Sequence, residues 1–101
     1  RGCGCLITFK VTKSGKNKKE GLAADCIAAK ALVSSLRYAC NVPSFGSVES
    51  SVCIPSETAY SNFSIEYRKS IGVPDNMVRL SVGIEHPEDI LEDLLRALTT
   101  L

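Results

Sequence analysis

The stretch "MVRLSVGIE", residues 77–85, decides the fold, because its apolar residues alternate with small or polar ones as they do in a β-strand. Successive side chains of a strand point to opposite faces of its sheet. One face is apolar and is predicted to meet the core, and it carries Val78, Leu80, Val82 and Ile84. The other face holds a single arginine, Arg79, with the small residues Ser81 and Gly83 beside it.

Arg79 has two interpretations from the residues alone. Most arginines face water, so the second face of the strand can simply be exposed. Alternatively, small neighbours leave room beside the guanidinium, whose planar fork pairs with a carboxylate or a phosphate through two parallel hydrogen bonds. The strand pattern by itself does not choose between a solvated arginine and an anion site.

The segments before this strand predict further elements of both kinds. Residues 5–11 alternate and indicate a strand whose buried face carries Cys5, Ile7, Phe9 and Val11. Residues 22–40 have apolar positions in steps of three and four, typical of one helix with Cys26 and Cys40 in its core stripe. "SSVCIP", residues 50–55, indicates a short strand, and a short helix is predicted at 65–70.

A helix is also predicted after the strand that contains Arg79. Pro87 suits its first position, and the acidic residues that follow favour a helix start. Its carboxylates are expected on a solvated face, and its buried stripe is Ile90, Leu91, Leu94, Leu95 and Leu98. We therefore predict a single domain over residues 1–101, an α/β sandwich with three or four strands and helices packed on the sheet.

Composition excludes several classes of function. The chain has 101 residues, of which 45% are hydrophobic and 23% charged, and a net charge of +1, as in ordinary globular domains. The lysine-rich stretch "TKSGKNKKEG", residues 12–21, has no interleaved aromatic residue, so we predict no nucleic-acid binding. No apolar run is long enough for a bilayer, so we predict no membrane partner and an intracellular location.

The cysteines and the one histidine do not suggest a metal site. Five cysteines are an odd number without a repeated spacing, which favours reduced thiols over a disulfide framework. Cys3 and Cys5 form a C-x-C pair, and His86 lies far away in the sequence, next to a helix-starting proline where it is expected to cap the helix. A redox or metal module would have to depend on Cys3 and Cys5 alone.

Several segments together resemble a known family. "PSFGSVES" (residues 43–50), a following "IP", and "YRKSIGVPDNMVRLSVGIEHPEDILEDLLRAL" (residues 67–98) resemble the C-terminal domain of the pyridoxal-phosphate-dependent trans-sulfuration enzymes. That family contains cystathionine γ-synthase, cystathionine γ-lyase, methionine γ-lyase and O-acetylhomoserine sulfhydrylase. The resemblance implies the small C-terminal, substrate-closing domain of a fold-type I enzyme that uses pyridoxal 5'-phosphate.

The resemblance also assigns roles to two residues. The arginine of the family's Val-Arg-Leu-Ser-Val-Gly motif, which holds the α-carboxylate of the amino-acid substrate, matches Arg79. The family's serine that helps to place this carboxylate matches Ser44. Arg79 and Ser44 are therefore the expected substrate-binding residues.

The chain departs from the family pattern at several places, among them Ser47 in place of the family's second glycine and the lysine-rich stretch, which resembles an insertion. Ala59 stands where the family has an active-site hydroxyl, Tyr60 replaces a histidine as in plant-type γ-synthases, and Pro43 stands where many lyases have a glutamate. No lysine lies in the family's Ser-x-Thr-Lys context, so the large cofactor-binding domain is expected upstream, and no catalytic residue and no activity are expected in these 101 residues alone.

Two hypotheses of different classes follow. In the first, the domain binds the substrate carboxylate in a cystathionine γ-synthase or γ-lyase type of enzyme. By resemblance this enzyme is a homo-oligomer, a tetramer, in the cytoplasm or a plastid. In the second, motivated by Ala59 and the lysine-rich stretch, it is a non-catalytic paralogue or scaffold that keeps the fold.

Overall fold

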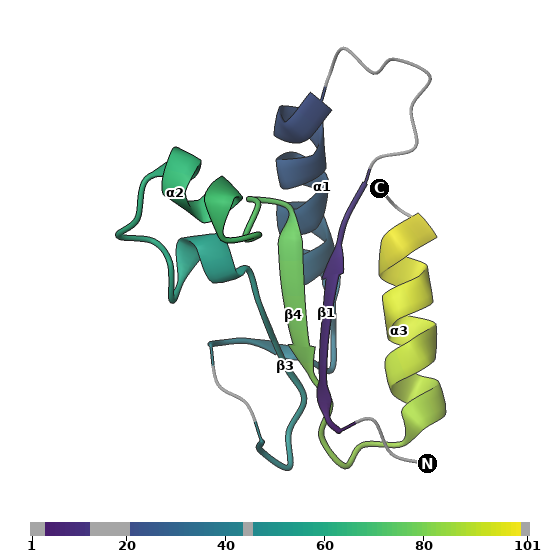
Figure 1. Ribbon diagram of the computed structural model, residues 1–101. Helices are drawn as coiled ribbons and strands as arrows, with labels where there is room; N and C mark the ends of the chain where they lie inside the picture. The colour runs from purple at the N-terminus through teal and green to yellow at the C-terminus, as the bar shows by residue number, and fades with distance from the viewer. Residues whose placement is uncertain (1–3, 13–20, 44–45, 100–101) are drawn as a thin grey trace.

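The protein alternates strands and helices (Figure 1). The computed structural model describes residues 4–12, 21–43 and 46–99, with only the backbone at 21–23. The elements in chain order are β1 (Leu6–Lys10), α1 (Gly21–Ser35), β2 (Cys40–Asn41), β3 (Ser51–Cys53), the 3-10 turn η1 (Pro55–Glu57), α2 (Ile65–Ser70), β4 (Met77–Ser81) and α3 (Pro87–Thr99). This order confirms the predicted α/β class, and β2 and η1 are additions to it. None of the described helices combines the length and the apolar character that a membrane span requires.

The sheet is mixed, with strand order β1-β4-β3-β2. β4 is antiparallel to both of its neighbours, β1 and β3, and β2 runs parallel to β3. The stretch that predicted a strand thus forms the strand with the most pairing, and Arg79 lies directly opposite Thr8 on one side and Cys53 on the other. The position of Arg79 is therefore fixed by hydrogen-bond ladders on both sides.

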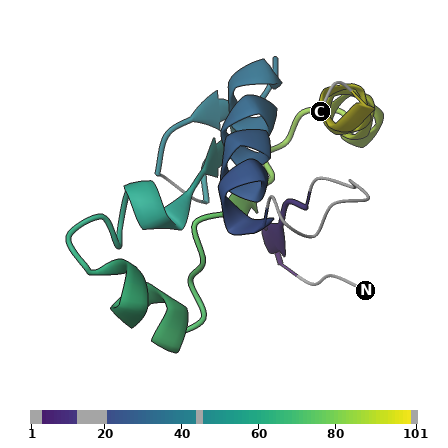
Figure 2. The ribbon, with the colours of Figure 1, turned by 90° about the horizontal axis from the view of Figure 1, so that it is seen from above.

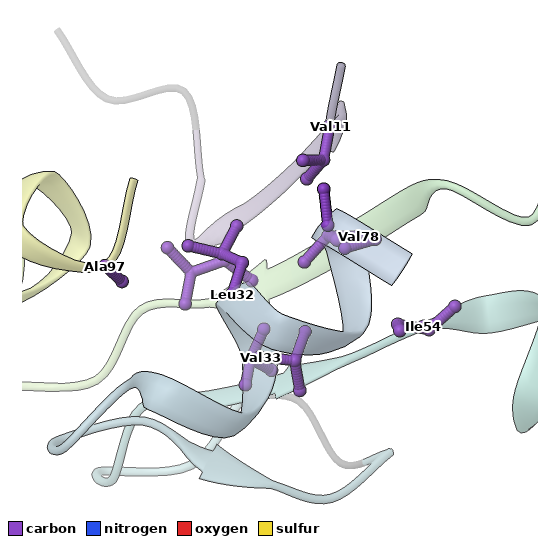
Figure 3. Close-up of a cluster of buried hydrophobic side chains, with 10 residues drawn as sticks. Val11, Leu32, Val33, Ile54, Val78 and Ala97 are labelled. Carbon is purple, nitrogen blue, oxygen red and sulfur yellow. The ribbon is translucent and has the colours of Figure 1, made fainter. Parts of the chain in front are cut away.

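The core lies on one face of the sheet. Val78 and Leu80 of β4 are buried, as predicted, together with Val52 of β3. Leu32 and Val33 of α1 and Ala97 of α3 belong to the same apolar cluster, so both long helices cover this face (Figure 3). Seen from above, α1 lies between α3 and the segment that carries α2 (Figure 2). Burial of these side chains supplies the main stabilisation of the domain.

The ends of β1 and β4 differ from the prediction. β4 ends at Ser81, the Val82 N–H still donates to the Cys5 carbonyl, and Ile84, beyond this contact, is 81% exposed. Just after β1, Val11 is buried as expected, but Ile7 on β1 and Cys5 just before it are exposed. The predicted apolar faces are therefore correct only where a helix covers them.

Helix α1 is shorter than predicted. It ends at Ser35, and Cys40 lies in β2 with an exposed side chain, so the placement of Cys40 in a helical core stripe was wrong. The reason lies in α3: the backbone N–H groups of Arg37 and Tyr38 donate to Asp93 Oδ2, at 2.7 and 3.1 Å. Arg96 Nη2 also donates to the Ser35 carbonyl, so α3 supplies polar caps to the end of α1.

The predicted buried stripe of α3 was wrong at Leu91, Leu95 and Leu98, whereas Leu94 packs against the core. The buried residues of this helix are Asp93 and Ala97, and Ile90 and Leu94 are half-buried. Leu91, Leu95 and Leu98 are between 41% and 55% exposed. An apolar groove of about 330 Å³ between β1 and α3 is lined by side chains that include Ile7, Phe9, Leu94 and Leu98. The described residues thus leave one face of α3 uncovered.

The short helix predicted at 65–70 is confirmed as α2. The Ser64 hydroxyl accepts from the Tyr67 N–H and caps its start. Arg68 anchors the segment, since its guanidinium donates to the carbonyls of Tyr60 and Phe63 and forms an ion pair with Asp75 at 3.0 Å.

Asp93 provides a test of the contact between α1 and α3. Burial raises the pKa of this carboxyl, but the hydrogen bonds from Arg96, Tyr38 N–H and Arg37 N–H outweigh burial, and the pKa is lowered. We expect Asp93→Asn to lower the free energy of unfolding by about 2 to 3 kcal/mol at pH 7, since it leaves donors unpaired in a buried site. A lowered pKa contributes stability above the ordinary carboxyl range and loses it as the pH falls below about 4.

Denaturant unfolding at pH 7 and at pH 3 measures the difference in free energy of unfolding between the parent and Asp93→Asn, which should be smaller at pH 3 than at pH 7. Asp89→Asn is the matched control, because Asp89 lies on the same helix and is exposed. Its effect should stay below about 1 kcal/mol. An equal effect of the two substitutions at pH 7 would contradict the capping role of Asp93.

Candidate functional site

Arg79 lies at the middle of β4, on the face of the sheet opposite to Val78 and Leu80. Its side chain is half-buried. The residues directly opposite on the neighbouring strands, Thr8 and Cys53, have small side chains on the same face. The strand thus presents a guanidinium among small residues, as the alternation in the sequence predicts.

The loop between Asn41 and Ser50, whose described residues are 42, 43 and 46–49, contacts this face and is here called the site loop. Arg79 Nη2 donates to the Pro43 carbonyl at 3.3 Å, and the Gly46 N–H donates to Ser81 Oγ at 3.1 Å. Ser81 is 1% exposed, so the loop excludes water from it. Gly46 has φ of +73°, a conformation that side chains disfavour. The site loop therefore forms the second wall of the Arg79 site.

Ser44, the other expected substrate-binding residue, lies outside the described residues. Its described neighbours are Pro43 on one side and Gly46 two residues further on, and these two contact Arg79 and Ser81. The role of Ser44 stays a prediction. The structure adds Ser81, which the sequence reasoning placed beside Arg79 but did not assign to the site.

A second set of contacts fixes the far end of the site loop. Glu85 accepts two hydrogen bonds from Ser50, one from its N–H and one from its hydroxyl, both at 2.9 Å. The Gly83 N–H donates to Ser50 Oγ at 2.9 Å. The hydrogen bonds to Glu85 from the Ser50 N–H and from its own N–H lower the pKa of this carboxyl, so it is ionised at neutral pH.

Sequence reasoning missed these contacts. Ser50, Gly83 and Glu85 all stand in the quoted motifs, but nothing in the spacing indicates that residues 33 to 35 positions apart meet. The only signals in the sequence were a serine just before one predicted strand and a Gly-x-Glu at the end of another.

The two unusual residues of the 55–60 segment lie after η1. Ala59 is exposed, and Tyr60 is half-buried with its ring 5.9 Å from that of Phe63. Phe63 in turn packs on Tyr67 at 5.1 Å. The Tyr60 side chain is therefore part of an aromatic group around α2.

The described lysines do not fit the covalent site of pyridoxal phosphate. Lys10, Lys30 and Lys69 are exposed, and Lys30 forms an ion pair with Glu57 at 3.0 Å. The hydrogen bond from Lys30 to Glu57 raises the pKa of this lysine. A Schiff-base lysine instead needs a buried position that favours the neutral amine. None of the three described lysines therefore has the surroundings that a Schiff-base lysine requires.

The described part of the chain also offers no metal centre. No group of three His, Cys, Asp or Glu residues in it is close enough to hold an ion. Its four cysteines, Cys5, Cys26, Cys40 and Cys53, are free, and Cys3 lies outside the described residues. His86 Nδ1 accepts from the Glu88 N–H at 3.3 Å, in agreement with the predicted cap.

Comparison with known proteins agrees with the motifs. The family model of the Cys/Met metabolism PLP-dependent enzymes matches residues 1–99. A cystathionine β-lyase of Lactococcus lactis subsp. cremoris is 42% identical over 95 residues, which are 94% of this chain and 22% of that protein. A chloroplastic cystathionine β-lyase of Mimosa pudica is 33% identical over 100 residues, which are 99% of this chain and 19% of that protein.

Solved structures give the same picture. The crystal structure of cystathionine γ-synthase from Xanthomonas oryzae pv. oryzae in complex with cystathionine superposes with a TM-score of 0.76 and 32% identity. The match covers 98% of this chain and 23% of that one. The chain thus spans about a fifth of the length of the relatives it matches.

Proposed function

Because this chain belongs to the family of the Cys/Met metabolism PLP-dependent enzymes, we propose that it is the C-terminal domain through which such an enzyme binds the α-carboxylate of its amino-acid substrate. The observation that carries the proposal is the Arg79 site. A half-buried guanidinium stands on the middle strand of a sheet, among small side chains and under a loop. A guanidinium can form two parallel hydrogen bonds with a carboxylate, whereas the ammonium group of a lysine acts as a single point charge. An arginine in such surroundings therefore suits the binding of a carboxylate.

The site supports an orienting role. A carboxylate held by two parallel hydrogen bonds fixes the direction of the rest of the amino acid, and a fixed direction lowers the entropy cost of reaction. A rigid strand serves this purpose well, because β4 is paired on both sides. The Ser44 hydroxyl is proposed as a further donor to the same carboxylate.

The substrate and the cofactor follow from the family. We propose a homoserine ester or a cystathionine-like amino acid, since relatives include a cystathionine β-lyase and a cystathionine γ-synthase. Pyridoxal phosphate supplies the covalent chemistry in this family, and its lysine is proposed to lie in the remaining part of a longer enzyme. Cytoplasm or plastid is the proposed location, the second supported by the chloroplastic relative.

The uncovered face of α3 supports a partner within the same protein. Leu91, Leu95 and Leu98 together with Ile7 of β1 form an exposed apolar surface, which a water-exposed helix rarely keeps. We propose that the large cofactor-binding domain covers it, since the relatives are about five times as long as this chain. Assembly into a homo-oligomer, a tetramer, is proposed on the family resemblance alone.

Arg79→Ala tests the proposed function in the full-length enzyme. Loss of a desolvated charge pair should raise KM for L-cystathionine by the equivalent of about 2 to 4 kcal/mol, roughly 30- to 1000-fold. Arg79→Lys keeps the charge but not the fork and should give an intermediate KM. Steady-state kinetics measure both variants.

Lys69→Ala is the matched control, because Lys69 is an exposed cation on α2. The KM of this variant for L-cystathionine should equal that of the parent enzyme. An unchanged KM in Arg79→Ala would remove the carboxylate-binding role. If the full-length protein holds no pyridoxal phosphate and turns over no amino acid, the non-catalytic scaffold replaces the enzyme as the function.

Leu95→Asp tests the apolar face of α3. If another domain covers this face, a charge there loses its hydration, and the melting temperature of the full-length protein should fall by several degrees, as expected for a loss of about 2 kcal/mol or more. Ser34→Asp introduces the same charge at an exposed position of α1 and should have little effect. Equal melting temperatures of the two variants would show that the α3 face stays in water.

A further inference from the structure

The described residues of the site loop include no buried side chain. Every described residue between 42 and 49 is exposed, and even its two valines, Val42 and Val48, are 42% and 62% exposed. The described residues of the loop therefore contribute no buried apolar contact to its position. The contacts that the structure describes for them are polar and steric, and they lie on the Arg79 face and at the far end of the loop.

Ser50 is the buried residue that follows the loop. It is 0% exposed, and its carbonyl accepts from the Cys40 N–H at 2.9 Å, which ties the start of the loop to its end. Its N–H and its hydroxyl both donate to the Glu85 carboxylate. An ionised carboxylate accepts at both oxygens, and such charge-assisted bonds are the stronger class of hydrogen bond.

Gly83 completes this group of contacts, which we call the Ser50–Gly83–Glu85 clamp. Its N–H donates to Ser50 Oγ, and the next N–H, of Ile84, donates to the Val48 carbonyl at 2.8 Å. A Cβ at residue 83 would collide with backbone atoms of Val48 and Glu49. The turn after β4 and the site loop therefore approach each other as closely as a glycine permits.

We propose that the Ser50–Gly83–Glu85 clamp positions the site loop for substrate binding, so that Glu85 is a positioning residue of the Arg79 site although it does not touch the substrate. The inference rests on the function proposed above. β4 joins the two sites, since Arg79 and Ser81 lie on the strand and Gly83 and Glu85 lie on the turn that follows it. One end of the loop meets Arg79 and Ser81, and the other end is held by the clamp.

A merely stabilising role for Glu85 makes a different prediction. If the clamp only adds to the stability of the fold, its loss lowers the melting temperature and leaves the affinity of the folded enzyme unchanged. If it positions the loop, its loss weakens the binding of any amino acid that has an α-carboxylate, and kcat of the saturated enzyme changes little. Binding constants and kcat therefore separate the two roles.

Glu85→Gln in the full-length, cofactor-loaded enzyme is the first experiment. Glycine is the probe, because it has the α-carboxylate but no side chain to eliminate, and its dissociation constant is read from the absorption of the bound cofactor. We expect an increase of about tenfold, as for the loss of one hydrogen bond to a charged group. KM for L-cystathionine should rise by about the same factor, with kcat within about threefold.

Three further variants make the test independent of one substitution. Ser50→Ala removes the hydroxyl from the clamp, and Gly83→Ala forces the turn and the loop apart, so each should also weaken glycine binding. Glu88→Gln is the matched control, because Glu88 is exposed at the start of α3, and it should bind glycine as the parent does. In the Arg79→Ala background, Glu85→Gln should add little, because the two changes act on one site.

The outcomes distinguish this inference from the proposed function. If Arg79→Ala leaves glycine binding unchanged, the carboxylate site and the clamp's role in it are both wrong. If Arg79→Ala weakens binding but the folded clamp variants bind glycine normally, the proposed function stands and the positioning role is wrong. Failure of all three clamp variants to fold would likewise overturn it, since the clamp would then serve the fold as a whole.

Discussion

The alternation of side chains along β4 places Val78 and Leu80 on one face of the sheet and Arg79 and Ser81 on the other. The first face is covered by α1 and α3, which contribute Leu32 and Ala97 to the core. The second face is covered by the site loop, which meets it through hydrogen bonds. A shift of β4 by one residue would turn both pairs over, so the core and the candidate site depend on the same strand register.

Two carboxylates, those of Asp93 and Glu85, have related structural roles. Asp93 accepts the N–H groups that follow α1, and Glu85 accepts the N–H and hydroxyl of Ser50. In each case the acceptor and donors are more than 30 residues apart in the chain. Each carboxylate fixes a place where the chain leaves regular structure and backbone groups would otherwise lack partners. Ionised acceptors suit this role, because one carboxylate satisfies several donors at once.

The sequence predicts the local elements well because their periodicities are local properties. β1, α1, α2, β4 and α3 all occur, and Arg79 stands on the predicted face. Cys40 was misplaced because the end of α1 is set by Asp93, a residue 53 positions away from Cys40. The structural roles of Asp93 and Glu85 were missed for the same reason. A carboxylate on a polar helix or turn is predicted to face water, because its hydrogen-bond donors lie far away in the sequence. Leu91, Leu95 and Leu98 were predicted to lie in the core of this domain, but they are exposed in it. An apolar pattern indicates that a helix face is covered, but it does not indicate whether the same domain or another one covers it.

The two walls of the Arg79 site are the strand β4 and the site loop, and they differ in how many contacts hold them in place. This difference determines which residues of the site can be substituted without loss of the fold. Arg79 is fixed by ladders to β1 and β3, so its position changes only if the sheet changes. The site loop is held by a few hydrogen bonds at its ends, and its exposed side chains can be exchanged at little cost in stability. Under the proposed function, recognition of the carboxylate common to all amino acids lies on the rigid strand. The exposed residues of the loop, Pro43 among them, can then be substituted to suit different substrate side chains, provided that the clamp at its far end is kept.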